Sequence, residues 1–243
     1  MNFELAFAPV RRFDTALDVL AEQAIALGFD AVDYGYVPAA RTANGMWISP
    51  PVVGRHLPRG WDRLWHRYST HDPYYHACYR RNLALDWREV RQAAWLSDIQ
   101  RQCVAYLDDV GFRDAMTVPV HLSGTRFAFV TLSVQRSDYC WDELKLHRAG
   151  NALLLAHTFQ HWVSEHAPEK LSRRPLARFS AREVECLRWA AASKTAPETA
   201  LIIGRSVETV RRHLKKAMSK LDAGTLAGAV ARAGACGLIE FSS

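Results

Sequence analysis

The sequence predicts an α+β protein: an N-terminal α-β-α sandwich with a mainly antiparallel sheet, followed by a small domain of four helices. Three observations support this fold class. Residues 1–165 alternate helical and strand patterns, and they include a strand hairpin. The last third of the chain repeats helix-capping residues ahead of short amphipathic segments. The excess positive charge of the chain lies in that same last third.

The N-terminal elements begin with a helix over residues 14–27, whose apolar residues recur at helical spacing and which ends at Gly28, a typical C-cap. The segment FDAVDYGYV at 29–37 has the composition of a strand, and MWISP at 46–50 is a second candidate strand. Residues 60–82 are dense in aromatic side chains and are predicted to form two short helices that meet at Asp72-Pro73.

A helix capped by Ser97-Asp98 is predicted to run to about Val110, where Gly111 closes it. Two strands, AMTVPVHL at 115–122 and FAFVTLSVQ at 127–135, are joined by a turn containing Ser-Gly-Thr and form a hairpin. A long amphipathic helix follows from Trp141 to Glu165. The next stretch is charged, contains two prolines and lacks apolar periodicity. We therefore place a first domain at 1–165, a linker at 166–178 and a second domain at 179–243.

Charge and composition narrow the classes of function. The net charge is +6, yet residues 168–243 hold 14 Lys and Arg against 7 Asp and Glu, a net of +7, so the rest of the chain is near neutral. A basic domain joined to a near-neutral one indicates a polyanion-binding module. The five cysteines form no CxxC pair and the ten histidines no ligand spacing, so we expect no metal, no cofactor and no disulfide framework. Free thiols, with no signal peptide and no long apolar run, indicate a cytoplasmic protein without membrane contact.

The C-terminal domain is predicted from its caps. Ser180 and Glu183 form a capping box ahead of the first helix, and Thr195 caps the second. Gly204 ends the second helix, and Ser206 caps a third helix that places apolar residues on one face and Lys and Arg on the other. A fourth helix over 227–235 closes the bundle.

Two helices joined by a tight glycine turn, the second of them basic on its outer face, form the helix-turn-helix pattern. Such a second helix fits a major groove about 12 Å wide, with its early residues at base edges and its later ones at phosphates. The alternative is an ordinary helical bundle with a solvated charged face. Agreement between charge, caps and turn favours double-stranded DNA as the partner.

The segment 180–239 resembles the LuxR-type DNA-binding domain in its S-x-R-E-x-E-x-L-x-W start, S-x-x-T-V-x-x-H-L core, K-L-D-A and G-L-I. Ser193 departs from the family, which usually has glycine before the lysine, and a positive φ there would be strained. By position, the resemblance implies base contacts from Arg211 and Lys215, and phosphate contacts from Lys194, Thr209, Arg212, Lys216 and Lys220. An arginine–guanine pair provides roughly 1–3 kcal/mol of discrimination.

The N-terminal domain resembles the autoinducer-binding domain of quorum-sensing LuxR-type regulators, through Trp61, Trp65, Asp72-Pro73, Trp87 and GFRDAMTVP at 111–119. The resemblance implies that Asp72 accepts the amide N–H of the ligand and that Trp87 donates its indole N–H to a lactone carbonyl. Trp61 and Trp65 would line the wall and contact the acyl carbonyl. Both polar roles suit the chemistry, because a buried carboxylate needs a donor and an indole N–H only donates.

Two further positions complete the predicted ligand site. Ser133 adds a candidate hydroxyl, and Ala115 stands where the family usually has glycine. The family also has tyrosine in place of Trp65, and the spacing from Trp65 to Asp72 is about two residues shorter than usual. Asp72 could otherwise be a helix cap, and the tryptophans could be ordinary core residues.

Three hypotheses follow. The first is a homodimeric transcription regulator that senses an N-acyl- or aryl-homoserine lactone, or a related amide, and binds a palindromic promoter site, with RNA polymerase as a further candidate partner. The second is a ligand-independent or plant-compound-responsive regulator whose first domain mainly dimerises. The third is an enzyme with a DNA-binding appendage. The sequence shows no nucleophile–base constellation, so we expect no catalytic residues and no enzyme.

Overall fold

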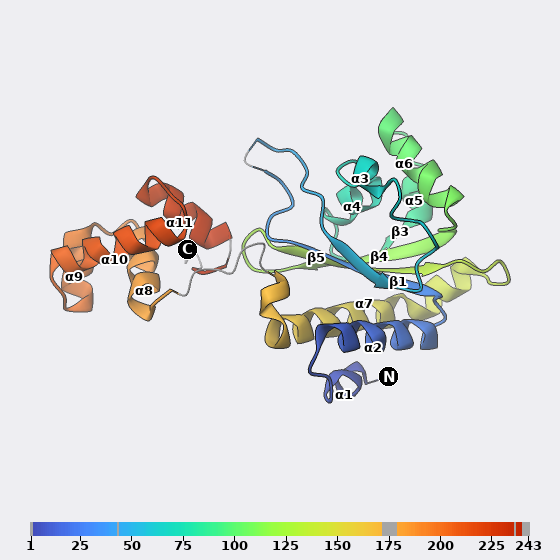
Figure 1. Ribbon diagram of the computed structural model, residues 1–243, viewed down its shortest axis with the longest axis horizontal. Coiled ribbons are helices and arrows are strands. Elements are labelled where there is room, and N and C mark those ends of the chain that lie inside the picture. The colour runs from blue at the N-terminus through green and yellow to red at the C-terminus, as the bar shows by residue number, and fades with distance from the viewer. Residues whose placement is uncertain (1, 43, 172–178, 236, 240–243) are drawn as a thin grey trace. The chain divides into compact units, whose positions relative to one another are not determined.

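The computed structural model describes residues 2–42, 44–171, 179–235 and 237–239, and the chain divides into two compact units (Figure 1). The N-terminal unit is built on a five-stranded sheet with the order β2-β1-β5-β4-β3. Every neighbouring pair of strands is antiparallel, as predicted. The strands are β1 (Ala31–Val37), β2 (Val52–Arg55), β3 (Leu85–Asp86), β4 (Asp114–His121) and β5 (Phe127–Val134).

The three central strands, β1, β5 and β4, are buried along almost their whole length because helices cover both faces of the sheet. The predicted strand at 46–50 is wrong: Trp47 makes only an isolated bridge with Arg41, and the second strand begins at Val52. The prolines at positions 50 and 51 explain the shift, because proline has no N–H to give to a strand ladder.

One face of the sheet carries α1 (Phe3–Phe7), α2 (Phe13–Ala26) and α7 (Trp141–His166) (Figure 1). Phe159 of α7 is fully buried, and its ring meets the rings of Phe7 and Tyr34. The Tyr34 hydroxyl donates a hydrogen bond of 2.8 Å to Gln160 of the same helix. This layer therefore has an aromatic core, within which Tyr34 and Gln160 form a buried hydrogen bond.

The opposite face carries four short helices, which complete the predicted α-β-α sandwich (Figure 1). They are α3 (Trp65–Tyr68), α4 (Pro73–Cys78), α5 (Trp87–Arg91) and α6 (Asp98–Asp109). As predicted, two short helices lie on either side of Asp72-Pro73, and a helix begins after Ser97, whose backbone N–H donates to Gln100. The elements α1, β3 and α5 were not predicted, since none is long enough to show a repeat.

The second unit contains α8 (Ala181–Ala191), α9 (Ala196–Ile203), α10 (Val207–Lys220) and α11 (Leu226–Ala235). The side chains of Ser180, Thr195 and Ser206 each accept a hydrogen bond from the N–H three residues on, as predicted. Gly204 ends α9 in the left-handed conformation, with φ of 63°. The helices enclose a small apolar core that includes Leu187, Val210, Leu214 and Ala217.

Ser193 lies in the left-handed region, with φ of 61°, where a residue with a side chain is strained. Its neighbour Lys194 donates its backbone N–H to the carbonyl of Trp189 at 2.9 Å and so closes the end of α8. The turn between α8 and α9 therefore keeps its shape at a cost of about 1 kcal/mol in backbone strain.

The predicted linker at 166–178 is described only in its first part. Helix α7 continues to His166, and the 3₁₀ helix η1 (Pro168–Leu171) follows it. Residues 172–178 lie outside the described residues. None of the helices described is both long and apolar enough to cross a lipid bilayer.

Candidate ligand pocket and DNA-binding helix

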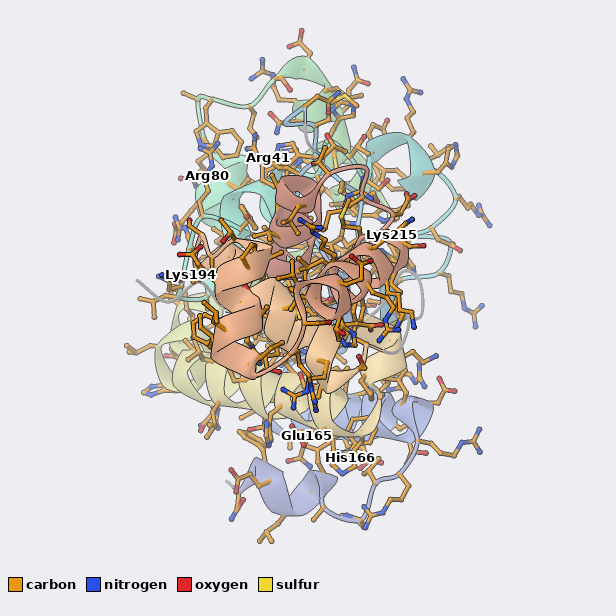
Figure 2. All side chains as sticks on the ribbon, turned by 90° about the vertical axis from the view of Figure 1, so that its left-hand side faces the viewer. Arg41, Arg80, Glu165, His166, Lys194 and Lys215 are labelled. Carbon is orange, nitrogen blue, oxygen red and sulfur yellow. The ribbon has the colours of Figure 1, made fainter. Side chains whose placement is uncertain are left out.

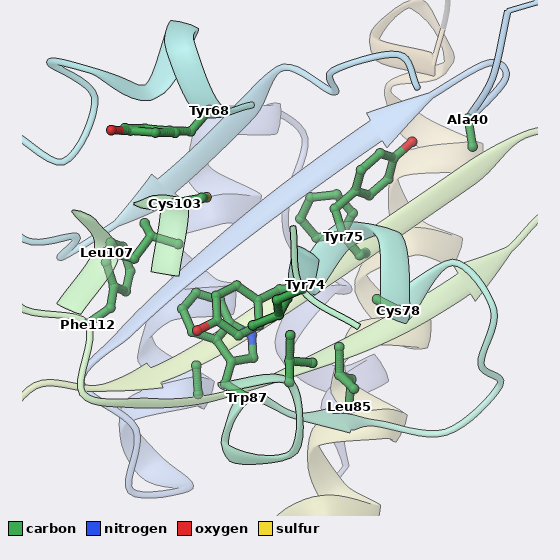
Figure 3. Packing of buried hydrophobic residues seen from close by; sticks show 14 of the residues in the cluster. Ala40, Tyr68, Tyr74, Tyr75, Cys78, Leu85, Trp87, Cys103, Leu107 and Phe112 are labelled. Carbon is green, nitrogen blue, oxygen red and sulfur yellow. The ribbon is translucent and has the colours of Figure 1, made fainter. Parts of the chain in front are cut away.

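A cavity lies in the N-terminal unit between the sheet and the layer of α3 to α6. Figure 3 shows part of the buried cluster around it. Its walls are mainly aromatic and apolar, and its polar lining consists of two carboxyl groups, two threonine hydroxyls and the polar edges of aromatic rings. The lining residues are Asp33, Val52, Trp61, Trp65, Asp72, Tyr74, Tyr75, Trp87, Leu107, Phe112, Thr117, Phe129 and Thr131.

Asp72 is both a helix cap and a wall of this cavity. Its carboxylate accepts the backbone N–H of Tyr74 at 2.9 Å, which fixes the start of α4. The residue is only 8% exposed. Burial raises the pKa of Asp72 to about 7, although backbone N–H groups of α4 oppose that rise. The structural and the ligand-binding interpretations of Asp72 are therefore compatible.

Trp87 lies at the start of α5, and its ring stacks on the ring of Tyr74 with the centroids 3.8 Å apart (Figure 3). Its indole N–H donates to the Thr117 hydroxyl at 2.8 Å. The resemblance assigns this indole N–H to a lactone carbonyl, but in the structure it is already hydrogen-bonded to Thr117 of β4. A ligand that takes this donor must compete with Thr117.

Trp61 and Trp65 form the outer wall of the cavity. Their rings are tilted against each other with centroids 5.7 Å apart, and both residues are half-buried. The hydroxyl of Tyr106, on α6, donates to the backbone carbonyl of Trp61. The structure thus brings four predicted ligand residues, Trp61, Trp65, Asp72 and Trp87, to one cavity.

Ala115 and Ser133 are partners across β4 and β5, and both are fully buried. They lie on the sheet face that carries the cavity, but they are not among its lining residues. The Ser133 hydroxyl has no hydrogen-bond partner within the described parts of the chain. A ligand contact from either residue remains a prediction, whereas Thr131, two residues earlier on β5, does line the cavity.

Asp33 is the acidic residue of the cavity that the sequence analysis missed. It lies in the middle of β1, opposite Thr131 of β5, and is 9% exposed. Burial raises the pKa of Asp33 to about 8, and the nearby charge of Asp72 adds to the rise, while a hydrogen bond with Thr131 opposes it. The available signal was an aspartate inside an otherwise apolar strand, where Asp is normally depleted.

The cavity is nearly filled by its lining side chains, with a free volume of about 30 Å³. That space holds about one or two water molecules, so a signal molecule fits only if aromatic side chains move. The stacked rings of Tyr74 and Trp87 occupy the centre of the surrounding cluster (Figure 3). Ligand binding therefore requires rearrangement of the helical layer.

Helix α10 has the two faces expected of a DNA-reading helix. Val210, Leu214 and Ala217 are buried in the core of the small unit. The predicted DNA-contacting side chains at 211, 212, 215 and 216 are exposed, as is Lys194 just before the cap of α9. Figure 2 labels two of these exposed lysines, Lys194 and Lys215. The cations are thus free to meet a polyanion.

Two of the residues that are predicted to contact DNA make interactions within the bundle itself. The Thr209 hydroxyl lies 2.8 Å from the Ser206 hydroxyl in the first turn of α10. The Lys220 ammonium forms an ion pair of 2.6 Å with the buried Glu183 of α8. Lys220 therefore links two helices of the bundle, and the predicted phosphate contacts of Thr209 and Lys220 remain predictions.

Residues 13–162 match the family described as autoinducer binding domain, and residues 177–233 match the bacterial regulatory proteins of the luxR family. The chain belongs to the LuxR family. This LuxR-family chain is accordingly a ligand-binding and DNA-binding transcription regulator of the quorum-sensing type, and not an enzyme. Within the described residues, no group of three or more His, Cys, Asp or Glu side chains is arranged to hold a metal ion.

Relatives of this LuxR-family regulator cover different parts of it. The transcriptional activator VanR of Vibrio anguillarum is 36% identical over 117 residues, which is 46% of each chain. The transcriptional activator AnoR of Acinetobacter nosocomialis is 26% identical over 239 residues, or 96% of each chain. The crystal structure of Escherichia coli SdiA has the same fold, with a TM-score of 0.74 and 22% identity over 97% of this chain and 95% of that chain.

Proposed function

We propose that this LuxR-family regulator senses an amide signal of the N-acyl- or aryl-homoserine lactone class and binds a palindromic promoter site as a homodimer. The observation that supports the ligand class is the placement of Asp72 and Trp87 in one aromatic-walled cavity. Asp72 supplies a hydrogen-bond acceptor for an amide N–H, and Trp87 supplies a donor for a carbonyl. Both groups are buried, so each bond forms away from competing water.

The Asp72 carboxyl has no ion-pair partner among the described residues, and its raised pKa reflects that isolation. An amide N–H from a ligand would offset part of the cost of burying the charge. For the Trp87 indole N–H to reach a lactone carbonyl, it must release Thr117, whose hydroxyl still has Thr131 as a neighbour at 3.1 Å. The cavity thus offers one acceptor and one exchangeable donor to the same ligand head.

The first prediction concerns thermal melting of the full chain with a panel of acyl- and aryl-homoserine lactones. A ligand at about 100 times its Kd should stabilise the N-terminal unit by about 2.7 kcal/mol, which corresponds to a rise in Tm of several degrees. Asp72→Asn is the matched control, because asparagine caps a helix as well as aspartate does but removes the charged acceptor. We expect this variant to keep the basal Tm and to lose most of the ligand shift. No shift with any lactone would discard this ligand class.

The proposed homodimer is supported by an exposed apolar strip on α7. Leu146 is 78% exposed and Leu154 is 51% exposed, and a Cβ built on Gly150 between them would meet no atom within 4 Å. Burying such a strip against a second copy would remove apolar surface from water. Two α10 helices related by a twofold axis would then meet half-sites about one helical turn apart. RNA polymerase remains a candidate partner of the DNA-bound dimer.

The second prediction concerns Arg211→Ala on α10. If Arg211 reads a guanine, its loss should weaken binding to the target promoter about tenfold or more and change binding to scrambled duplex much less. Lys216→Ala, at a predicted phosphate contact, should weaken both duplexes and reduce the salt dependence by about one ion. Fluorescence anisotropy at several salt concentrations measures both effects. Arg182→Ala, on α8 and paired with Glu185, is the matched control. Equal losses on both duplexes for Arg211→Ala would refute its role as a base reader.

A second candidate function is a ligand-independent regulator whose first domain only dimerises. The nearly filled cavity favours it, because a filled core needs no ligand for stability. It predicts full DNA affinity in protein purified without any signal, and no change of Tm with lactones. The melting experiment therefore separates the two functions.

A further inference from the structure

Three neighbouring strands place polar side chains in one row on the cavity side of the sheet. Asp33 of β1 is the register partner of Thr131 of β5, and Thr131 is the partner of Thr117 of β4. The Thr131 and Thr117 hydroxyls lie 3.1 Å apart, and Thr117 accepts the indole N–H of Trp87. Thr131 faces Asp33 across the β1–β5 pair, and its hydroxyl opposes the rise in the pKa of Asp33. A row of polar groups thus runs from Trp87 through the two hydroxyls toward Asp33.

The direction of the hydrogen bonds in this row follows from Trp87. The indole N–H can only donate, so the Thr117 hydroxyl accepts from it and is left to donate to Thr131, whose own hydroxyl is left to donate toward Asp33. When ionised, Asp33 is the acceptor at the end of the row. A carboxylate has about four acceptor positions, and Thr131 is the one side-chain donor recorded for it among the described residues. The Asp33 carboxylate can therefore accept further hydrogen bonds from a ligand in the cavity.

The surroundings of Asp33 supply no balancing cation. The side chains that line the cavity include no Lys, Arg or His, and the other carboxyl there is Asp72. A ligand group with only lone pairs, such as a carbonyl oxygen, would face a carboxylate and be repelled. A hydroxyl would donate to it instead and satisfy the remaining acceptor.

We propose that Asp33 is a second recognition point for the signal, which selects ligands with a hydrogen-bond donor, such as a hydroxyl, on the acyl part. In its ionised form, the same carboxylate discriminates against ligands that bring only a carbonyl oxygen to that place. Asp72 and Asp33 then divide the task, because one holds the amide and the other reads the acyl substituent. This inference rests on the proposed amide-sensing function.

A pH profile distinguishes recognition by Asp33 from a structural role. The other titratable side chains facing the cavity are Asp72, Tyr74 and Tyr75. Because burial raises the pKa of Asp33 to about 8, the group holds a proton below that pH and can then donate to a ligand carbonyl. A hydroxyl ligand favours the ionised form. The preference for hydroxyl over carbonyl should therefore grow as pH rises through about 8.

The test uses the full chain and matched ligand pairs, the β-hydroxyacyl and β-oxoacyl forms of one homoserine lactone. The corresponding pair of acyl ethanolamides, which have the amide but no lactone, forms a second series. Affinities are measured by calorimetry at about pH 8.5, half a unit above the value for Asp33. We expect the hydroxyl member to bind at least about tenfold more tightly in each series that binds, because a polar site left unpaired rejects the analogue strongly.

Asp33→Leu should abolish the preference, and Asp33→Asn should reduce it, since an amide both donates and accepts. Asp72→Asn is the control: it should weaken both members of a pair and leave their ratio unchanged. Hydroxyl preference in the ethanolamides alone would remove the lactone from the proposed function and support the role of Asp33. Equal affinities within the pairs, or a preference that survives Asp33→Leu, would overturn the role of Asp33 while the amide-sensing function stands. Binding of no member of either series would overturn both.

Discussion

Replacing Glu183 with alanine is expected to lower the free energy of unfolding of the α8–α11 bundle by about 3 kcal/mol. The Glu183 carboxylate accepts the backbone N–H of Ser180 at 2.9 Å and the ammonium of Lys220 at 2.6 Å. Loss of the capping box costs about 1 kcal/mol, and loss of the ion pair with the half-buried ammonium adds about 2 kcal/mol. Burial alone would raise the pKa of Glu183, but Lys220 and the Ser180 N–H hold it below its usual value.

Hydrogen exchange of the full chain measures this effect locally. Amides of α10 should exchange about 100-fold faster in Glu183→Ala, whereas those of β5 and α7 provide an internal control. Glu183→Gln is the matched variant, because glutamine keeps the oxygen for Ser180 but has no charge for Lys220. We expect it to lose about two thirds as much free energy, which corresponds to about 30-fold faster exchange. Unchanged exchange in α10 would show that the ion pair does not stabilise the bundle.

The ion pair with Glu183 also changes what we expect when Lys220 is replaced. A residue that contacts only phosphate would affect DNA binding without affecting the fold. Because Lys220 joins the end of α10 to the start of α8, Lys220→Ala is expected to lower stability as well as affinity. Lys216, which is exposed on the same helix, is the better probe of a pure phosphate contact.

The N-terminal unit is expected to lose about 2 kcal/mol of unfolding free energy as pH rises from about 6.5 to about 8. Burial raises the pKa of Asp33 to about 8 and that of Asp72 to about 7, whereas a carboxyl group in the unfolded chain titrates near about 4. The folded state therefore binds more protons than the unfolded state in this window. The contribution of these two carboxyl groups to stability is fully present below their pKa in the unfolded chain. It is lost as pH rises through their pKa values in the folded state.

Urea denaturation at several pH values checks this dependence. His76 has a pKa lowered to about 4, chiefly by burial, so it acts in the opposite direction only below its ordinary value of 6.5. Between about pH 6.5 and about pH 8, the change in unfolding free energy therefore comes from Asp33 and Asp72. Asp33→Asn should remove more than half of the slope. A free energy that stays level or rises with pH in the wild type would contradict the burial of two unpaired carboxyls.

Local signals explain why the C-terminal elements were predicted closely. Ser180, Thr195 and Ser206 each satisfy the first free N–H groups of the helix that follows, so the sequence itself marks where α8, α9 and α10 begin. The longer helices and the β4–β5 hairpin of the first unit also show enough repeats to be predicted. β3 has two residues and exists only through its pairing with β4, which no local pattern reveals.

The ligand site was predicted only in part, for the same reason. Trp61, Trp65, Asp72 and Trp87 follow a known spacing, and the structure brings them to one cavity. The row of Asp33, Thr131 and Thr117 depends on the register between β1 and the β4–β5 hairpin, which lie far apart in the sequence. Ser133 shares a strand face with Thr131, but it lies further along β5, beyond the lining of the cavity.

The face-to-face packing of Tyr74 and Trp87 has a kinetic consequence. With their centroids 3.8 Å apart, the two rings leave no gap between them, so a molecule can occupy the space between them only after they have separated. At low ligand concentration, the rate of binding is proportional to that concentration. At high concentration it reaches a ceiling set by how often the rings part.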